Sequence, residues 1–226
     1  VERVEIVWDE VLGLEGRAGY YDRTGALKDM VQNHLLQLLA LVAMEPPITL
    51  SPRDFRDRKT DVLRAVRRLT PAEIREQTVR GRYIAGERNG KPIPGYLEED
   101  GVDPENGTET FAQVELRIDN WRWAGVPFLL RSGKALKKER KEIAIHFHPV
   151  PHLTFDNGEQ PHANLLRLAI NPDRMELQVN INGPGDPLQL EDALLATRLA
   201  PEGVPAYGRL LYDVLHGQPT FTIRDD

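Results

Sequence analysis

Apolar and polar residues alternate at the start of the chain, where Val4, Ile6 and Trp8 share one side of a period-two pattern and Glu5 lies on the other. This alternation is typical of a β-strand with one buried face. Further segments with the same pattern cover 111–119, 126–132, 142–148, 165–170 and 175–181. Little helical pattern separates them, so we expect neighbouring strands to pair antiparallel through hairpins.

Helical periodicity is strongest between Thr24, a residue suited to an N-cap, and Pro46, which stops the pattern. Positions 27, 31, 34, 38 and 41 carry Leu, Val, His, Leu and Leu, which predicts that His34 lies on the buried stripe. Other helices are predicted over 52–70, 188–199 and 206–217, and a long functional or packing loop over 81–107.

The order of these elements predicts an α+β fold. We expect a large, mainly antiparallel sheet with helices packed on one face, including a long helix that carries His34. A length of 226 residues suits one domain of roughly 200–250 residues.

The amino-acid composition argues against several classes of binding partner and of chemistry. The chain has 29 Lys and Arg against 35 Asp and Glu, a net charge of −6, which argues against binding to nucleic acid or to an anionic membrane. It has no cysteine, so disulfides and thiolate chemistry are excluded and a reducing compartment is favoured. No apolar stretch of about 20 residues is present. We therefore predict a cytoplasmic protein.

The first residues already have a strand pattern and no initiating Met, so we expect that a segment preceding Val1 is missing. A dinucleotide-binding fingerprint would need Gly-x-Gly-x-x-Gly between a strand and a helix, whereas Gly13, Gly16 and Gly19 have a different spacing. The sequence therefore predicts no Rossmann unit within the chain.

Two residues of the helix predicted between Thr24 and Pro46 could act in proton transfer or in binding. An imidazole titrates near neutral pH, so His34 could be a general base, or it could be a core histidine bonded to a backbone carbonyl. Asp29 lies five positions earlier, about 140° around an α-helix, and so would not stack with His34. It could line a cleft or interact with the helix dipole.

A basic segment, 131–141, includes Lys134, Lys138 and Arg140 in an otherwise acidic chain. Clustered cations beside a strand end suit a phosphate, although a solvated run of charges is the alternative. His146, His148 and His152 raise the question of a metal. No carboxylate or Cys completes a regular ligand set with them, so we predict no metal site.

Three long runs resemble glucose-6-phosphate dehydrogenases in family order: residues 13–47, 91–136 and the segment AYGRLLYDVLHGQPTF near the C-terminus. The resemblance implies that 1–226 is the C-terminal, substrate-binding domain, truncated at both ends and normally preceded by an NADP-binding Rossmann domain. It also implies oxidation of glucose 6-phosphate to 6-phosphogluconolactone, the first step of the pentose phosphate pathway. The expected assembly is a homodimer through the sheet.

The resemblance also implies roles for single residues. His34 matches the family base that removes the C1 hydroxyl proton, and Glu10 and Asp29 match carboxylates that hold sugar hydroxyls. Lys134 matches a lysine of the substrate pocket. The implied substrate contacts that follow are a second basic residue, Lys138 or Arg140, and Asn171, which stands where the family has a Gln before a Pro.

A different class of function stays open at this point. The chain could be a non-catalytic module that binds a sugar phosphate or forms a dimer. Because the implied carboxylate partner of His34 and the coenzyme fold lie in the Rossmann domain, we expect the isolated chain to be inactive.

Overall fold

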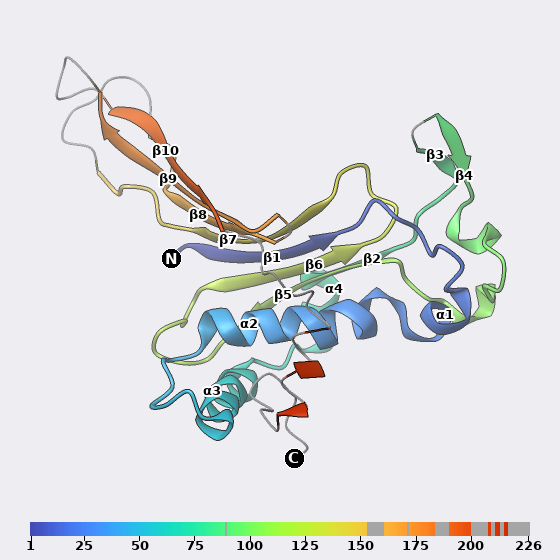
Figure 1. The fold of residues 1–226 in the computed structure, drawn as a ribbon, viewed down its shortest axis with the longest axis horizontal. Helices are drawn as coiled ribbons and strands as arrows, with labels where there is room; N and C mark the ends of the chain where they lie inside the picture. Colours follow the sequence, from blue (N-terminus) through green and yellow to red (C-terminus); the bar gives the residue numbers. More distant parts are fainter. Residues whose placement is uncertain are drawn as a thin grey trace.

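The computed structural model describes residues 1–88, 90–152, 161–170, 172–183 and 190–199, together with Gly208, Leu211, Tyr212, Leu215 and His216. Its centre is an eight-stranded sheet in the order β10-β9-β8-β7-β1-β6-β5-β2 (Figure 1). The strands are β1 (Arg3–Asp9), β2 (Thr78–Gly81), β5 (Phe111–Arg117), β6 (Pro127–Gly133), β7 (Arg140–His146), β8 (Leu165–Ala169), β9 (Arg174–Asn182) and β10 (Leu190–Arg198). A separate hairpin joins β3 (Gly86–Arg88) to β4 (Lys91–Ile93).

Strand pairing in the sheet is antiparallel except between β1 and β6, which run parallel to each other in its interior. The predicted α+β class with a mainly antiparallel sheet is therefore confirmed. The parallel pair has a consequence for function, because the carboxyl ends of β1 and β6 leave the sheet at the same edge.

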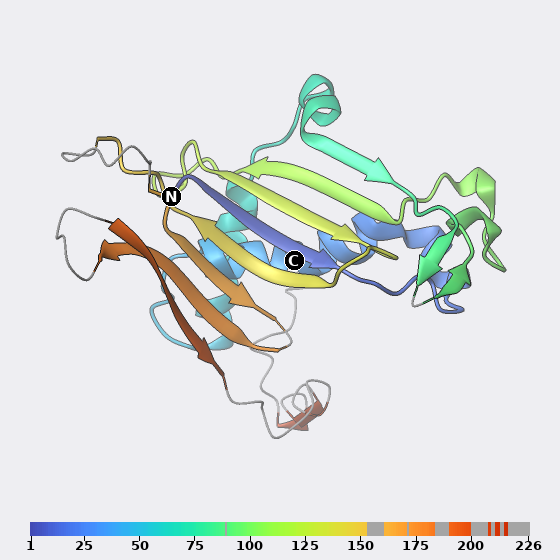
Figure 2. The same cartoon turned by 90° about the horizontal axis from the view of Figure 1, so that it is seen from above.

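Most of the helices lie along one side of the sheet (Figure 1), and one lies beside its edge strand β2 (Figure 2). They are α1 (Ala18–Ala26), the π-helix η1 (Leu27–Leu35), α2 (Leu36–Ala43), α3 (Pro52–Ala65) and α4 (Pro71–Gln77), with short 3₁₀ turns η2 (Tyr96–Glu98) and η3 (Pro104–Asn106). Ser51 and Thr70 cap α3 and α4 by accepting bonds from backbone N–H groups, each just before a proline at the helix start. Within the described residues, no helix is both long and apolar enough to cross a membrane.

The core lies between the sheet and this helical layer. Alternate residues of β1 and β6 meet the apolar side of η1 and α2, and Val4, Leu35 and Phe128 are completely buried there. Trp123 packs edge-on against Phe128, with ring centroids 5.1 Å apart, and its indole N–H donates to the Ala43 carbonyl at 2.9 Å. The end of α2 is thereby tied to the sheet.

The main helix differs from its prediction at its start. Helical structure begins at Ala18, and Thr24 is not an N-cap, because its hydroxyl donates to the Tyr20 carbonyl inside α1. The helical path is interrupted at Gly25, where φ is 69° and ψ is 172°. Gly25 adopts this left-handed φ without the steric cost that a Cβ would bring.

The predicted buried stripe is confirmed at Val31 and wrong at His34. His34 and Leu27 are exposed, and the residues that face the core are Val31, Leu35 and Leu39. The prediction assumed α-helical periodicity throughout, whereas 27–35 is a π-helix with more residues in each turn. The wider turn shifts the phase of the helix and moves His34 out of the core.

The predicted helix over 188–199 is a strand in the structure. Residues 190–198 form β10, which pairs antiparallel with β9 along its whole length. The backbone bonds and side-chain contacts along β9 override the helical pattern of this segment. The helix predicted over 206–217 lies largely outside the described residues.

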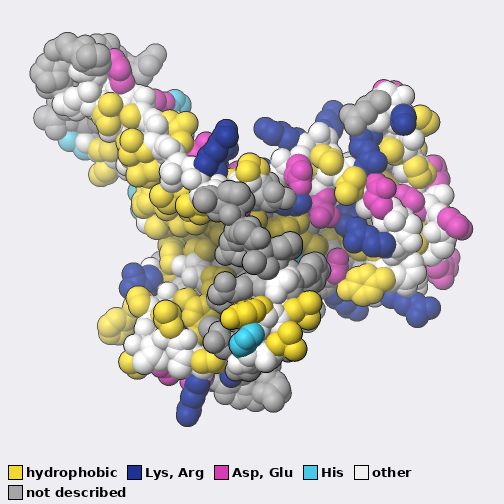
Figure 3. All heavy atoms as spheres, viewed as in Figure 1, with side chains coloured by type: hydrophobic (Ala, Val, Ile, Leu, Met, Phe, Trp, Pro, Cys, Tyr) yellow, Lys and Arg dark blue, Asp and Glu magenta, His cyan; other side chains and the backbone are white. Residues whose placement is uncertain are grey.

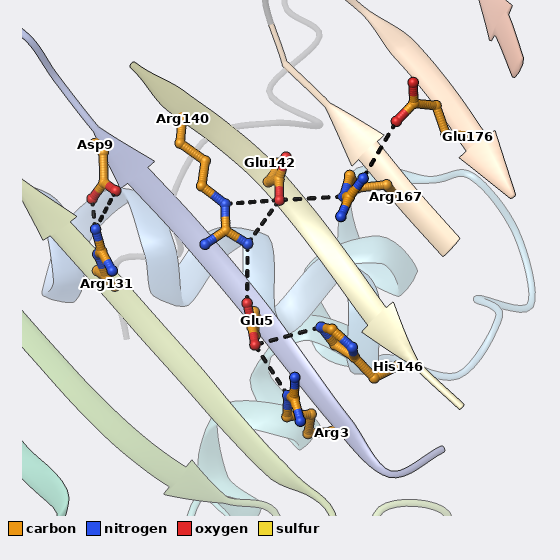
Figure 4. A network of polar contacts seen from close by, with 9 residues as sticks. All are labelled: Arg3, Glu5, Asp9, Arg131, Arg140, Glu142, His146, Arg167 and Glu176. Atoms are coloured by element: carbon orange, nitrogen blue, oxygen red, sulfur yellow. Dashed lines mark hydrogen bonds and ion pairs between the residues drawn. The ribbon is translucent and has the colours of Figure 1, made fainter. Parts of the chain in front are cut away.

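The face of the sheet opposite the helices carries a network of ion pairs (Figure 4). Glu5 of β1 accepts bonds from Arg3 and Arg140, both at 3.0 Å, and its Oε1 lies 3.4 Å from Nε2 of His146. Arg140 also bonds Glu142, and the chain of contacts continues through Arg167 to Glu176 at the β9 position beside it. Burial alone would raise the pKa of Glu5, but the bonds from Arg140 and Arg3 hold it below its usual value.

This network of ion pairs predicts that the free energy of unfolding falls as the pH is lowered. Burial, with the charge of Arg3, lowers the pKa of His146 from 6.5, so the unfolded state binds more protons than the native state as pH falls through that range. The free energy of unfolding should therefore decrease between about pH 7 and pH 5, and further below pH 4.5 as Glu5 protonates. Urea unfolding at a series of pH values measures both phases.

His146→Gln should flatten the upper phase, whereas His148→Gln, at an exposed position, should leave it unchanged. Identical pH profiles for the two variants would show that His146 is not the responsible group.

Candidate functional site

Glu10 and Lys134 form the centre of the site, because they directly follow the two parallel strands. The Glu10 N–H donates to the Gly133 carbonyl at 2.8 Å, and the Leu136 N–H donates to the Glu10 carbonyl at 2.9 Å, so the two strand ends are fastened together. Lys134 Nζ lies 2.6 Å from Glu10 Oε2. The sheet topology thus joins two residues that are 124 positions apart.

This pair is partly removed from water. The Lys134 side chain is 7% exposed and that of Glu10 26%. Burial alone would raise the pKa of Glu10, but the bond and charge of Lys134, with a contribution from Lys141, hold it below its usual value. Glu10 is therefore an ionised acceptor at neutral pH, and Lys134 is a cation with donors directed toward it.

Asp29 and His34 occupy one face of η1, contrary to the sequence-based geometry. In a π-helix the backbone bonds link residue i to residue i+5, so residues five positions apart are about one turn apart and lie on the same side of the helix. Asp29 accepts a hydrogen bond from the Tyr20 hydroxyl at 3.1 Å. The π-helix therefore presents a carboxylate and an exposed imidazole together, beside the strands β1 and β6 against which it packs.

Tyr21 connects the strand pair with the helix. Its ring centroid lies 5.2 Å from Lys134 Nζ, and its hydroxyl is buried without a hydrogen-bond partner among the described residues. Burial and the charges of Asp29 and Glu109 raise the pKa of the Tyr21 phenol, so it stays protonated and able to donate. Sequence patterns gave no sign of this role, since Tyr21 precedes Thr24, where the predicted helix begins.

Asp22, beside Tyr21, anchors α1 to the loop that precedes β5. Its carboxylate accepts bonds from the Tyr96 hydroxyl, from the Asp103 N–H at 3.0 Å and from the Asn106 side chain at 2.6 Å. Tyr96 and Tyr21 pack in the same small apolar cluster. The tyrosine beneath Lys134 is therefore held by buried contacts on both sides.

Lys138 and Arg140, the two candidates for a second basic substrate contact, lie in different places. Lys138 is exposed in the turn before β7. Arg140 bonds Glu5 and Glu142 on the opposite face of the sheet, so the structure does not bring it to Glu10 and Lys134. Lys141 lies on their side: it pairs in register with Trp8, and its Nζ is 5.3 Å from the Trp8 ring. Strand parity could have identified Lys141, because it lies two positions before the core residue Ile143 in β7 and so shares its face of the sheet.

The remaining predicted groups add little to this site. Asn171 lies outside the described residues. His146 belongs to the network on the opposite face, and His148 and His152 are exposed. Among the residues that the structure describes, no three His, Asp or Glu side chains converge as metal ligands.

Together these side chains can bind an anion that carries several hydroxyl groups. Lys134 and Lys141 supply positive charge, and Glu10 and Asp29 supply acceptors for hydroxyl donors. His34 supplies an imidazole, a side chain of the kind that acts as a general base. The exposed side of η1 leaves the imidazole accessible to a substrate.

The comparisons with known proteins all point to the same family. The family described as "Glucose-6-phosphate dehydrogenase, C-terminal domain" matches residues 1–226. The glucose-6-phosphate 1-dehydrogenase of Rhizobium meliloti is 43% identical over 236 residues, covering 100% of this chain and 47% of that protein. The Bacillus subtilis protein of the same name is 42% identical over 233 residues, covering 97% and 46%.

Solved structures agree in fold. A glucose-6-phosphate dehydrogenase in complex with its substrate glucose 6-phosphate superposes with a TM-score of 0.83 at 33% identity, covering 100% of this chain and 46% of the other. The Mycobacterium avium glucose-6-phosphate 1-dehydrogenase gives 0.81 at 38% identity, covering 97% and 45%. The chain thus spans about half the length of the relatives that it matches.

Proposed function

Because this chain belongs to the family of glucose-6-phosphate dehydrogenase C-terminal domains, we propose that it forms the sugar-binding and proton-accepting half of an NADP-dependent glucose-6-phosphate 1-dehydrogenase. The observation that carries the proposal is the joining of Glu10 and Lys134 at the ends of the parallel strands, beside a π-helix with Asp29 and His34 on one face. A module that served only for assembly would need none of these four residues.

Each group has a role in this reaction. Lys134 and Lys138 donate to anionic and hydroxyl oxygens of glucose 6-phosphate, with Lys141 adding positive charge. Glu10 and Asp29 accept bonds from sugar hydroxyls. His34 takes the proton of the C1 hydroxyl while a hydride leaves C1, so that the C1–O bond becomes the carbonyl of the lactone. Asn171, outside the described residues, keeps its proposed substrate contact.

The coenzyme does not fit the described part of this chain. The glycine-containing connection between β1 and α1 lacks the spacing that admits a pyrophosphate at a helix N-terminus. We therefore assign the nicotinamide, which accepts hydride when bound, to another part of the enzyme. His34 makes no side-chain hydrogen bond among the described contacts, which supports an orienting carboxylate supplied from elsewhere.

The test compares the full-length gene product with the isolated chain 1–226, following glucose 6-phosphate-dependent NADP reduction by absorbance. We expect turnover by the full-length protein and none by the isolated chain above a His34→Ala control, because the sequence 1–226 contains no Rossmann dinucleotide fingerprint. Failure of the full-length protein to oxidise glucose 6-phosphate would remove the proposed function. Turnover by the isolated chain would contradict the division of roles.

We also propose that the protein is a homodimer through the sheet. Hydrophobic side chains gather over β8, β9 and β10 in Figure 3, whereas charged side chains dominate the opposite end, near α1 and the β3–β4 hairpin. On the edge strand β10, Leu194 and Leu195 point to opposite faces and are 61% and 60% exposed. An apolar edge of this kind favours pairing with a second copy. Sedimentation of the isolated chain should show a dimer. A monomer would contradict the proposed homodimer.

A further inference from the structure

The helix that presents Asp29 and His34 begins with an unusual junction. Gly25 leaves the helical region between α1 and η1, so the first backbone N–H groups of η1 lack helical partners. The residue at the N-cap position, Ala26, has no side chain that could accept from them. The start of η1 must therefore be stabilised by groups from elsewhere in the chain.

Glu109 supplies those groups from the loop before β5. Its Oε1 accepts from the Leu27 N–H at 2.9 Å, and its backbone carbonyl accepts from the Ala26 N–H at 3.1 Å. The residue thus caps η1 from 82 positions away in the sequence. A carboxylate here also interacts favourably with the positive end of the helix dipole.

The capping carboxylate is itself held in place. Its side chain is 10% exposed, and Oε2 accepts from Arg80 at 2.7 Å. Arg80 also donates to the Gly107 carbonyl at 3.2 Å, which links β2 to the same loop. A Cβ on Gly25 would lie 2.6 Å from Glu109 Oε1, so a glycine is required by the close approach as well as by its φ.

From these contacts we infer that Glu109 is a positioning residue: by capping η1 at the Gly25 break, it sets the place and the phase of the π-helix that presents Asp29 and His34. The inference rests on the proposed function for its kinetic consequence. A displaced helix would keep the fold but would move the base relative to the C1 hydroxyl. Displacements of about 1 Å can cost on the order of 10²-fold in rate.

The experiment uses the full-length gene product and compares Glu109→Ala with Glu73→Ala. Glu73 is a matched control, because it also caps a helix, α4, and pairs with an arginine, Arg67, but lies away from the site. We expect Glu109→Ala to lower kcat by about 10- to 100-fold, with a smaller change in the KM for glucose 6-phosphate. Glu109→Gln, which keeps an acceptor oxygen, should recover part of the rate. Glu73→Ala should leave kcat unchanged.

A second measurement does not depend on catalysis. Hydrogen exchange of the segment 26–35 should accelerate in Glu109→Ala and not in Glu73→Ala. If Glu109→Ala does not fold, Glu109→Asp replaces it in both measurements, since the shorter side chain cannot reach both Leu27 and Arg80. Unchanged kcat in a folded Glu109 variant, or equal loss in both alanine variants, would overturn the inference. A wild-type protein without glucose 6-phosphate turnover would remove the proposed function, and the exchange comparison would still test the cap.

Discussion

Replacing His34 with asparagine should lower kcat of the full-length enzyme by about 10²–10⁴-fold, the usual contribution of a general base. The imidazole is exposed on η1, so its removal leaves the core unchanged and the fold should persist. Asparagine is polar but cannot accept a full proton in the transition state. The KM for glucose 6-phosphate should change little, because the proposed binding groups are other side chains. Steady-state kinetics with purified protein measures both constants.

Gln32→Ala provides the control for His34→Asn. Gln32 is also exposed on η1, so its truncation tests whether any change in this helix slows the enzyme. We expect the kcat of Gln32→Ala to stay close to that of the wild type. Near-normal turnover by His34→Asn would show that another group takes the C1 proton, and the role of His34 would have to be abandoned.

Replacing Lys134 with methionine should raise the KM for glucose 6-phosphate by about 10- to 100-fold, the effect of losing a hydrogen bond from a charged donor of about 1.5–3 kcal/mol. Methionine retains most of the aliphatic stem over the Tyr21 ring. It also removes the Lys134 Nζ that lies 2.6 Å from Glu10. The ionised carboxylate of Glu10 is then less stable, because it is partly buried without its cation. Titration of the purified protein with glucose 6-phosphate gives the affinity directly.

Lys137→Met separates this local contact from the general charge of the basic segment. Lys137 lies three positions away and is exposed, so its loss removes the same charge without touching Glu10. We expect at most a small change in affinity for this variant. Equal losses of affinity in the two variants would mean that diffuse positive charge, and not a bond from Lys134, attracts the sugar phosphate.

Local patterns predicted the strands over the core because β1, β5 and β6 each bury alternate residues. In β1, Val4 and Ile6 meet the helices while Glu5 joins the ion pairs on the other side. Such strands show their alternation directly in the sequence. β10 could not be predicted this way: it lies at the sheet edge with both faces largely exposed, and its sequence pattern is helical. Only its pairing with β9 makes it a strand.

The candidate residues at the site were identified through family motifs, but their arrangement depends on distant contacts. Spacing in an ideal α-helix separates Asp29 from His34, and the π-helix brings them to one face. The same assumption placed His34 in the core. Parity along β7 assigns Lys141 to the side of Glu10 and Arg140 to the opposite face, a distinction that the charge of the segment does not reveal.

The sequence by itself determined the family, the α+β class and the chemical types available at the site, because these depend on local pattern and on motifs of ten or more residues. Tertiary structure alone decided how those groups meet. The parallel pairing of β1 with β6 joins Glu10 to Lys134, and Glu109 caps a helix 82 residues away in the sequence. Both are long-range contacts whose geometry is fixed by the whole sheet and its packed helices, so no short window of sequence contains them.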